Sequence, residues 1–134
     1  MILVVALDNS NGMMFNFRRQ SKDRVLIDDL MNRLGNDKLF VNDFSFDLFE
    51  EKYSSSVTVC DNPLEAAGIG DYCFVENMDV TPYKDKIEKL LIYKWNRDYP
   101  GDVFFPFDIH NTNVLCEFQG SSHDKITLET GELE

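Results

Sequence analysis

Four basic side chains lie close together near the start of the sequence, around a single carboxylate. Arg18, Arg19, Lys22 and Arg24 fall within seven residues, and Asp23 is the only acid among them. The segment has a net charge of +3 in a chain of formal charge -11, so the other residues together carry -14. Basic residues at a helix N-terminus oppose the helix dipole, which makes a counter-anion favourable. The segment predicts a site for a phosphate, a carboxylate or an acidic surface, or else pairing with the protein's own carboxylates.

Asp23 itself has two interpretations. On the first turn of a helix, a partly buried carboxylate can hydrogen-bond the amidine-like edge of a ring or help to protonate a substrate. A carboxylate in that place also stabilises the helix dipole without any further role. Asp23 is therefore the candidate catalytic residue, and an ordinary helix-terminal acid is the alternative.

Other kinds of catalytic site are not indicated. His110 and His123 are the only histidines, and their spacing matches no HxH, HExxH or HxxxH pattern, which argues against a zinc hydrolase and leaves no expected metal site. The serine runs at 54–56 and 121–122 lack a nucleophile elbow and are typical of turns. The single glycine in residues 9–12 cannot supply a dinucleotide fingerprint.

Composition indicates one globular domain spanning residues 1–134. The chain is 43% hydrophobic and 13% aromatic, which is enough for a compact core. Its strong negative charge disfavours the phosphate backbone of DNA or RNA. No apolar run approaches the roughly 20 residues that cross a membrane. We therefore expect no nucleic-acid partner and no membrane partner.

Cysteine usage and the first residues indicate a cytoplasmic protein. Cys60, Cys73 and Cys116 are widely spaced within apolar runs, so reduced thiols are expected. The apolar residues 2–7 lack a positively charged start and are followed at once by Asp8, which is typical of a buried strand and not of a signal peptide.

Alternating apolar and polar segments must position these side chains. The apolar runs lie at residues 2–7, 38–41, 57–60, 72–75 and 89–95. Helical or turn-rich segments separate them, which is typical of an α/β protein with a mostly parallel sheet covered by helices on both faces. Strand-like runs at 113–118 and 125–128 predict a C-terminal antiparallel hairpin, followed by a frayed acidic tail at 129–134.

Helix signals lie between these strands. The first helix has Ser21 as its expected N-cap, an apolar face, and Gly35 just beyond its end. A second helix is expected from about residue 44, because aromatic residues recur three and four apart as far as Tyr53. A third, at 61–68, has a polar cap, Pro63 in its first turn and a closing glycine. A brief helical turn is expected at 84–88.

The order of these features resembles dihydrofolate reductase. Three stretches carry the resemblance: residues 6–12 with the loop and helix that follow, residues 38–46, and residues 89–93 with the YPGDVFFP segment at 99–106. The last segment is similar to the family's acidic-Gly-Asp-x-x-Phe-Pro ending. The resemblance implies a dihydrofolate reductase-like three-layer fold, with a mostly parallel central sheet, helices on both faces and a C-terminal antiparallel hairpin.

The resemblance also implies a ligand cleft beside the first helix. Asp23 falls where the family has its pterin-binding carboxylate, and Tyr93 falls where the family has a small hydroxyl residue facing the pterin. Core packing is the alternative for Tyr93. The expected ligand-binding residues are Ala6, Asn11, Arg18, Arg19, Arg24, Ser45 and Tyr93.

The motifs with which the family binds NADPH are replaced. Where the family has Gly-Arg-x-Thr, this chain has NDFS at 42–45, so an arginine that contacts phosphate becomes Asp43. Where the family has a run of glycines, this chain has VENMD at 75–79, which places Glu76 there. The chain is also about one strand and loop shorter between Tyr53 and Ala66. We expect no cofactor, and NADPH is the candidate if one is used.

Three functions follow, in order of preference. The first is a diverged dihydrofolate reductase-like protein that binds a small planar or anionic ligand beside the first helix. The second is a non-catalytic acidic module on the same fold that binds a protein partner. The third is an active NADPH-dependent reductase. The sequence alone does not decide between an enzyme and a binding protein.

Overall fold

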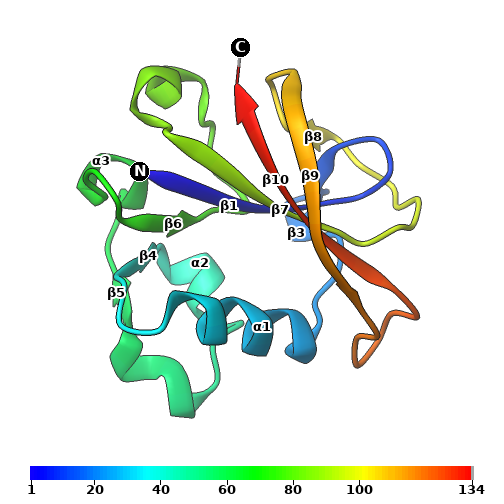
Figure 1. Cartoon of the computed structure of the whole chain (residues 1–134), viewed down its shortest axis with the longest axis horizontal. Helices are drawn as coiled ribbons and strands as arrows, with labels where there is room; N and C mark the ends of the chain where they lie inside the picture. Colours follow the sequence, from blue (N-terminus) through cyan, green and yellow to red (C-terminus); the bar gives the residue numbers. More distant parts are fainter. Residues whose placement is uncertain (134) are drawn as a thin grey trace.

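Two β-sheets organise the chain in the computed structural model, which describes residues 1–133. The larger sheet has seven strands in the order β5-β4-β6-β1-β7-β10-β9, and the smaller has three in the order β3-β2-β8. The strands are β1 (Ile2–Leu7), β2 (Gly12–Phe15), β3 (Arg18–Arg19), β4 (Leu39–Val41), β5 (Val57–Val59), β6 (Tyr72–Phe74), β7 (Lys89–Lys94), β8 (Val103–Phe104), β9 (Ile109–Phe118) and β10 (Ile126–Leu133). From β5 to β7 all neighbours are parallel, and β10 is antiparallel to both β7 and β9 (Figure 1). The predicted α/β class and mostly parallel sheet are confirmed.

Helices are few and short. They are α1 (Arg24–Leu34), α2 (Asp43–Phe46) and α3 (Pro63–Ala66), with 3-10 helices η1 (Glu51–Ser56) and η2 (Thr81–Lys86). Among the described residues, no helix has the length and apolar character that a bilayer crossing needs. The three cysteines are unpaired, as predicted.

Strand β1 separates two hydrophobic cores. Successive side chains of a strand point to opposite faces. Val4 accordingly packs in the core that contains the apolar face of α1, whereas Leu3 and Val5 pack in the core that contains Leu64 of α3. α1 and α3 therefore lie on opposite faces of the large sheet (Figure 1).

The N-cap of the first helix lies two residues later than predicted. Asp23, and not Ser21, is the N-cap: its backbone is extended, with φ -152° and ψ 123°, and its carboxylate accepts a hydrogen bond from Val25 N. Asp23 is favoured because the turn between β9 and β10 supplies further donors to the same carboxylate. The predicted end at Gly35 is confirmed, since Gly35 has a positive φ of 57° and donates its N–H to Met31 O.

Two other predicted boundaries are wrong. The second helix stops at Phe46 instead of reaching Tyr53, because Tyr53 lies in η1 and its hydroxyl donates to Asp28 at 2.6 Å. The tail after residue 128 is not frayed: β10 continues to Leu133, held by β7 on one side and β9 on the other. Glu134, the last residue of that predicted tail, lies outside the described part. The third helix has the predicted polar cap, Asn62, and Pro63 in its first turn, but it ends at Ala66 with Ala67 as its C-cap, so the predicted closing glycine lies beyond it.

The small sheet was not predicted, and it carries Arg18 and Arg19 of the basic segment. β2 pairs with β3 through Met14 and Arg19, and with β8 through Gly12 and Phe104. Strands of two to four residues are too short to show a period-two pattern. The turn between β2 and β3 places Phe17 in the left-handed region, at φ 62°, with 94% of the side chain exposed.

Candidate functional site

Asp23 is the centre of a hydrogen-bonded cluster at the N-terminus of α1. Its carboxylate accepts from five protein donors: Val25 N, Ser121 N, Ser121 Oγ, Ser122 N and His123 Nδ1, at 2.8 to 3.1 Å. The residue is only 4% exposed. Burial by itself raises the pKa of this carboxyl group, but the donors, His123 first among them, outweigh burial and hold the pKa well below its usual range. Asp23 is therefore an ionised acceptor whose lone pairs already accept hydrogen bonds from the protein.

The approach of the β9–β10 turn depends on Gly120. A Cβ atom added there would clash with Asp23 Oδ2 and lie 2.7 Å from Asp23 Cγ. Gly120 also donates its N–H to His123 O at 2.9 Å, which closes the turn. Only glycine allows the turn to reach the carboxylate this closely.

His123 extends the cluster toward the surface. Its Nε2 lies 3.0 Å from Ser21 Oγ and 2.9 Å from the hydroxyl of Tyr99. The ring stacks on Trp95, with centroids 4.5 Å apart and an interplanar angle of 23°. His123 is 3% exposed, whereas Ser21 and Tyr99 are half-buried. The imidazole is thus fixed from both ends and along one face.

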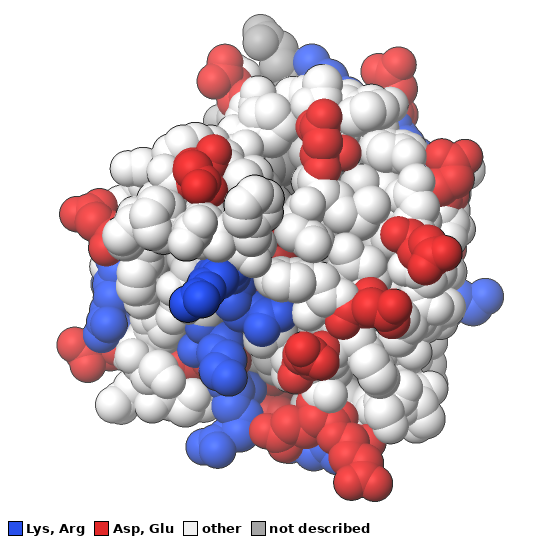
Figure 2. All heavy atoms as spheres, turned by 180° about the vertical axis from the view of Figure 1, so that it is seen from behind, with Lys and Arg blue, Asp and Glu red and all other residues white. Residues whose placement is uncertain are grey.

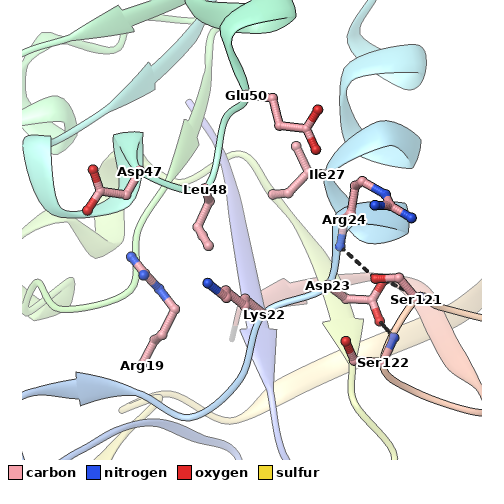
Figure 3. Close-up of a pocket in the computed structure, with 10 residues that line it drawn as sticks. All are labelled: Arg19, Lys22, Asp23, Arg24, Ile27, Asp47, Leu48, Glu50, Ser121 and Ser122. Atoms are coloured by element: carbon pink, nitrogen blue, oxygen red, sulfur yellow. Dashed lines mark hydrogen bonds between the residues drawn. The ribbon is translucent and has the colours of Figure 1, made fainter.

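A basic hollow of about 410 Å³ opens beside this cluster. Figure 3 shows the charged ends of Arg19 and Lys22 pointing toward the same opening, while Asp47 and Glu50 form the opposite rim. The full lining is Arg19, Lys22, Asp23, Arg24, Ile27, Asp47, Leu48, Glu50, Ser121 and Ser122. The hollow therefore combines cations, one apolar wall and an acidic rim.

Three of the cations near this hollow form no salt bridge with the described carboxylates. Within residues 1–133, no carboxylate lies within 4.0 Å of the charged groups of Arg18, Lys22 or Arg24. Figure 2 shows Lys and Arg side chains gathered in one area of a face, next to a run of Asp and Glu. In a chain of net charge -11, these three side chains were expected to find partners if pairing with the protein's own acids were their role.

Arg19, the fourth basic residue, is satisfied within the protein. Its guanidinium donates to both oxygens of Glu76, at 3.0 and 3.2 Å, and to Phe44 O at 2.8 Å. It also lies over the Phe44 ring, 4.6 Å from the centroid. Ser45, which is fully buried, donates its hydroxyl to Glu76 at 2.8 Å. The Glu76 carboxylate therefore holds two of the predicted ligand-binding side chains, Arg19 and Ser45, against each other.

The remaining predicted ligand residues are not brought together. Tyr93 is fully buried in the core and donates its hydroxyl to Asp29 at 2.6 Å; burial first, and then this bond, raise the pKa of Tyr93. Asn11 is exposed in the turn after β1, where its carbonyl accepts from Phe105 N. Ala6 lines a narrow cavity of about 10 Å³ between α1 and the sheet, a volume that holds about one water molecule. That cavity is too small for a planar ring.

Two components of the site were not predicted. His123 was considered only as a metal ligand, and Ser21 was expected only as a helix N-cap. Their meeting depends on the pairing of β10 with β7, which brings the β9–β10 turn to the start of α1. A Gly-Ser-Ser-His turn at 120–123 was the one local signal available.

Within residues 1–133 no three His, Cys, Asp or Glu side chains are grouped so that they could hold a metal ion. The cations of the hollow are suited to an anion, and the His123 cluster is suited to proton transfer. No protein-family model matches the chain, and a comparison with curated proteins found no match.

Proposed function

We propose that the protein is a diverged dihydrofolate reductase-like protein that binds a small anionic molecule in the basic hollow beside α1. The observation that carries this proposal is that Lys22 and Arg24, which line the hollow, form no salt bridge within residues 1–133 of a strongly acidic chain, and neither does Arg18 nearby. Charge-assisted hydrogen bonds from Lys and Arg are the usual means of holding a carboxylate or phosphate. The fold assignment rests on the resemblance of residues 6–12, 38–46, 89–93 and 99–106.

The lining narrows the chemistry of this ligand. Ile27 and Leu48 offer an apolar wall, which suits a short hydrocarbon or aromatic body. Asp47 and Glu50 on the opposite rim repel a second negative charge. A molecule with one acidic group and a compact neutral or basic remainder is therefore favoured over a polyphosphate. Binding of a ring beside Ala6 is disfavoured, because the cavity there has a volume of only about 10 Å³.

Titration with simple anions tests the proposal. Trp95 stacks on His123, whose Nδ1 bonds to Asp23 in the lining of the hollow, so its fluorescence should report binding. We expect inorganic phosphate and benzoate to change this fluorescence or raise the melting temperature, and Lys22→Ala with Arg24→Ala to weaken binding at least about tenfold. Lys38→Ala is the matched control, since Lys38 is an exposed cation outside the hollow. Unchanged signals with phosphate, benzoate, folate and NADPH would rule the proposal out.

Two observations bear on the other functions. A protein-binding role on the same fold is favoured by Phe17, an aromatic side chain that is 94% exposed at the tip of the β2–β3 turn. A pull-down at low salt that recovers no stoichiometric partner would count against that role. An active NADPH-dependent reductase is disfavoured, because Arg19 and Ser45 already donate hydrogen bonds to Glu76. NADPH oxidation in the presence of dihydrofolate is the assay for that activity.

A further inference from the structure

A line of hydrogen bonds joins a hydroxyl, an imidazole and a carboxylate at the edge of the basic hollow. Ser21 Oγ lies 3.0 Å from Nε2 of His123, and Nδ1 of the same ring lies 2.9 Å from Oδ2 of Asp23. This is the order of groups that activates a serine hydroxyl, with a base between the nucleophile and an orienting carboxylate. We propose that Ser21 is the nucleophile of an acyl-transfer site, with His123 as general base and Asp23 as the residue that orients it.

Asp23 determines which nitrogen of His123 carries the hydrogen. The carboxylate already accepts from backbone N–H groups of Ser121 and Ser122, and it is held in its ionised form. An ionised carboxylate can only accept, so Nδ1 of His123 is the donor in that bond. In the neutral ring the lone pair of Nε2 then faces Ser21, as a general base requires.

The nucleophile is accessible, whereas the base is not. Ser21 is half-buried and lines a second hollow of about 390 Å³ together with Phe17, Arg18, Arg19, Lys22 and Phe44. His123 lies behind Ser21, stacked on Trp95 and closed off from solvent. A substrate can therefore reach the hydroxyl while the proton acceptor stays out of water.

A positive charge lies next to the nucleophile. Lys22 follows Ser21 in the sequence and lines both hollows. Its ammonium group has no carboxylate within 4.0 Å among the described residues. Such a charge is suited to stabilising the oxyanion that forms when a carbonyl is attacked.

The predicted reaction is hydrolysis of a small carboxylic ester. Ser21 Oγ bonds to the carbonyl carbon while its proton moves to Nε2 of His123. The bond between that carbon and the alcohol oxygen breaks, and the alcohol leaves with the proton. Water then attacks the acyl-serine by the same path, which releases the acid and restores Ser21. Water is the only co-reactant. Esters that carry an acidic group should be preferred, and only this preference rests on the function proposed above.

Tyr99 provides a way to separate this role from a purely structural network. Its hydroxyl lies 2.9 Å from the same Nε2 and 3.4 Å from Ser21 Oγ. When Tyr99 donates to Nε2, Ser21 cannot give its proton there. Removal of this hydroxyl should therefore make Ser21 more reactive, whereas loss of a structural hydrogen bond alone would not.

Covalent labelling with a neutral biotin-tagged fluorophosphonate tests the proposal. The Ser21 oxygen bonds to phosphorus, fluoride leaves, and His123 takes the proton. We expect peptide mass spectrometry to find the label on Ser21, Ser21→Ala to abolish it, and Tyr99→Phe to speed it about threefold. His123→Gln should slow labelling at least about tenfold, with circular dichroism confirming that each variant is folded.

Three results would overturn the proposal. These are no label on Ser21 under conditions that label a known serine hydrolase, label only on the serines at 54–56 or 121–122, and an unchanged rate in Tyr99→Phe. If His123→Gln does not fold, the comparison of Ser21→Ala with Tyr99→Phe still decides the outcome. Phosphate titration does not require Ser21, and labelling by a neutral probe does not require phosphate, so the two proposals can fail separately.

Discussion

Oδ2 of Asp23 and Nδ1 of His123 lie 2.9 Å apart, although the two residues are 100 positions apart in the sequence. The contact joins the N-terminus of α1 to the turn between β9 and β10. Two backbone N–H groups of that turn reach the same carboxylate at 2.8 Å. The ionised Asp23 carboxylate therefore links α1, the β9–β10 hairpin and the candidate site.

Replacement of Asp23 by asparagine should destabilise the protein by about 2–4 kcal/mol. The amide nitrogen would face groups that donate, so at least two of the five present hydrogen bonds would be lost, at about 1–3 kcal/mol for each unsatisfied buried group. Urea denaturation measures this change. Asp124→Asn, an exposed neighbour, is the control and should change stability little. Equal effects of the two variants would show that the charge of Asp23 has no special role.

Acid should remove the stability that Asp23 contributes. Its pKa in the folded protein lies below its ordinary value of 3.8, so folding favours the charged form. The contribution is complete above that ordinary pKa and is lost as pH falls below it toward the folded value. The difference in unfolding free energy between the unmodified protein and Asp23→Asn should be constant from pH 5 to 7 and should narrow below about pH 4. A difference that did not vary with pH would contradict this assignment.

Gly120→Ala should weaken the same junction by steric means. The added methyl group would meet the Asp23 carboxylate, which its donors hold in place, and overpacking of this kind costs about 1–3 kcal/mol. Gly68→Ala is the matched control, because a Cβ there would lie 3.4 Å from Asp71 Oδ2, with no closer atom. Thermal unfolding of both variants provides the measurement. If both lost the same stability, the tight approach at Gly120 would not matter.

Glu76→Gln should strengthen anion binding in the basic hollow. The Glu76 carboxylate now accepts two hydrogen bonds from Arg19, and its neutralisation frees that guanidinium charge. The dissociation constant for phosphate should fall by about threefold to tenfold, equivalent to about 1 kcal/mol. Isothermal titration calorimetry measures this change, with the exposed Glu65→Gln as the control for net charge. Weaker binding in Glu76→Gln would mean that Glu76 supports the site instead of competing for it.

Tyr93→Phe should lower stability and leave anion binding unchanged. The variant loses the 2.6 Å hydrogen bond to Asp29, and a bond to a charged partner contributes about 1.5–3 kcal/mol. The effect should lie at the lower end, because Asp29 keeps its ion pair with Arg33 at 2.9 Å. Chemical denaturation and phosphate titration together distinguish a core residue from a ligand contact. A change in phosphate affinity with no change in stability would return Tyr93 to the ligand site.

The large sheet was predictable because its signals are local. Apolar runs mark the parallel strands, and Gly35 marks the end of α1 through its left-handed backbone. The small sheet was not, since β3 is only two residues long. Sequence spacing could place Asp23 and the basic residues at one helix terminus. It could not identify their partners, because those contacts depend on tertiary packing.

Three residues illustrate this limit. His123 reaches Asp23 only after β10 has paired with β7. Glu76 lies 57 positions from Arg19, and no local pattern joins them. Tyr93 falls in a strand that is buried on both faces, so alternation of side chains does not reveal which of them reach a cavity. In each case the arrangement of the strands in the folded protein decides which side chains meet.

The strand order also sets a condition on how the chain folds. β9 precedes β10 in the sequence, yet β10 lies between β7 and β9. The edge of β7 must therefore stay vacant while β9 is already present, although an open strand edge accepts other strands readily. Premature pairing of β9 with β7 would trap the chain in a wrong sheet. Pairing of β9 with β10 before either strand meets β7 would avoid this error, because the hairpin then docks on β7 through β10.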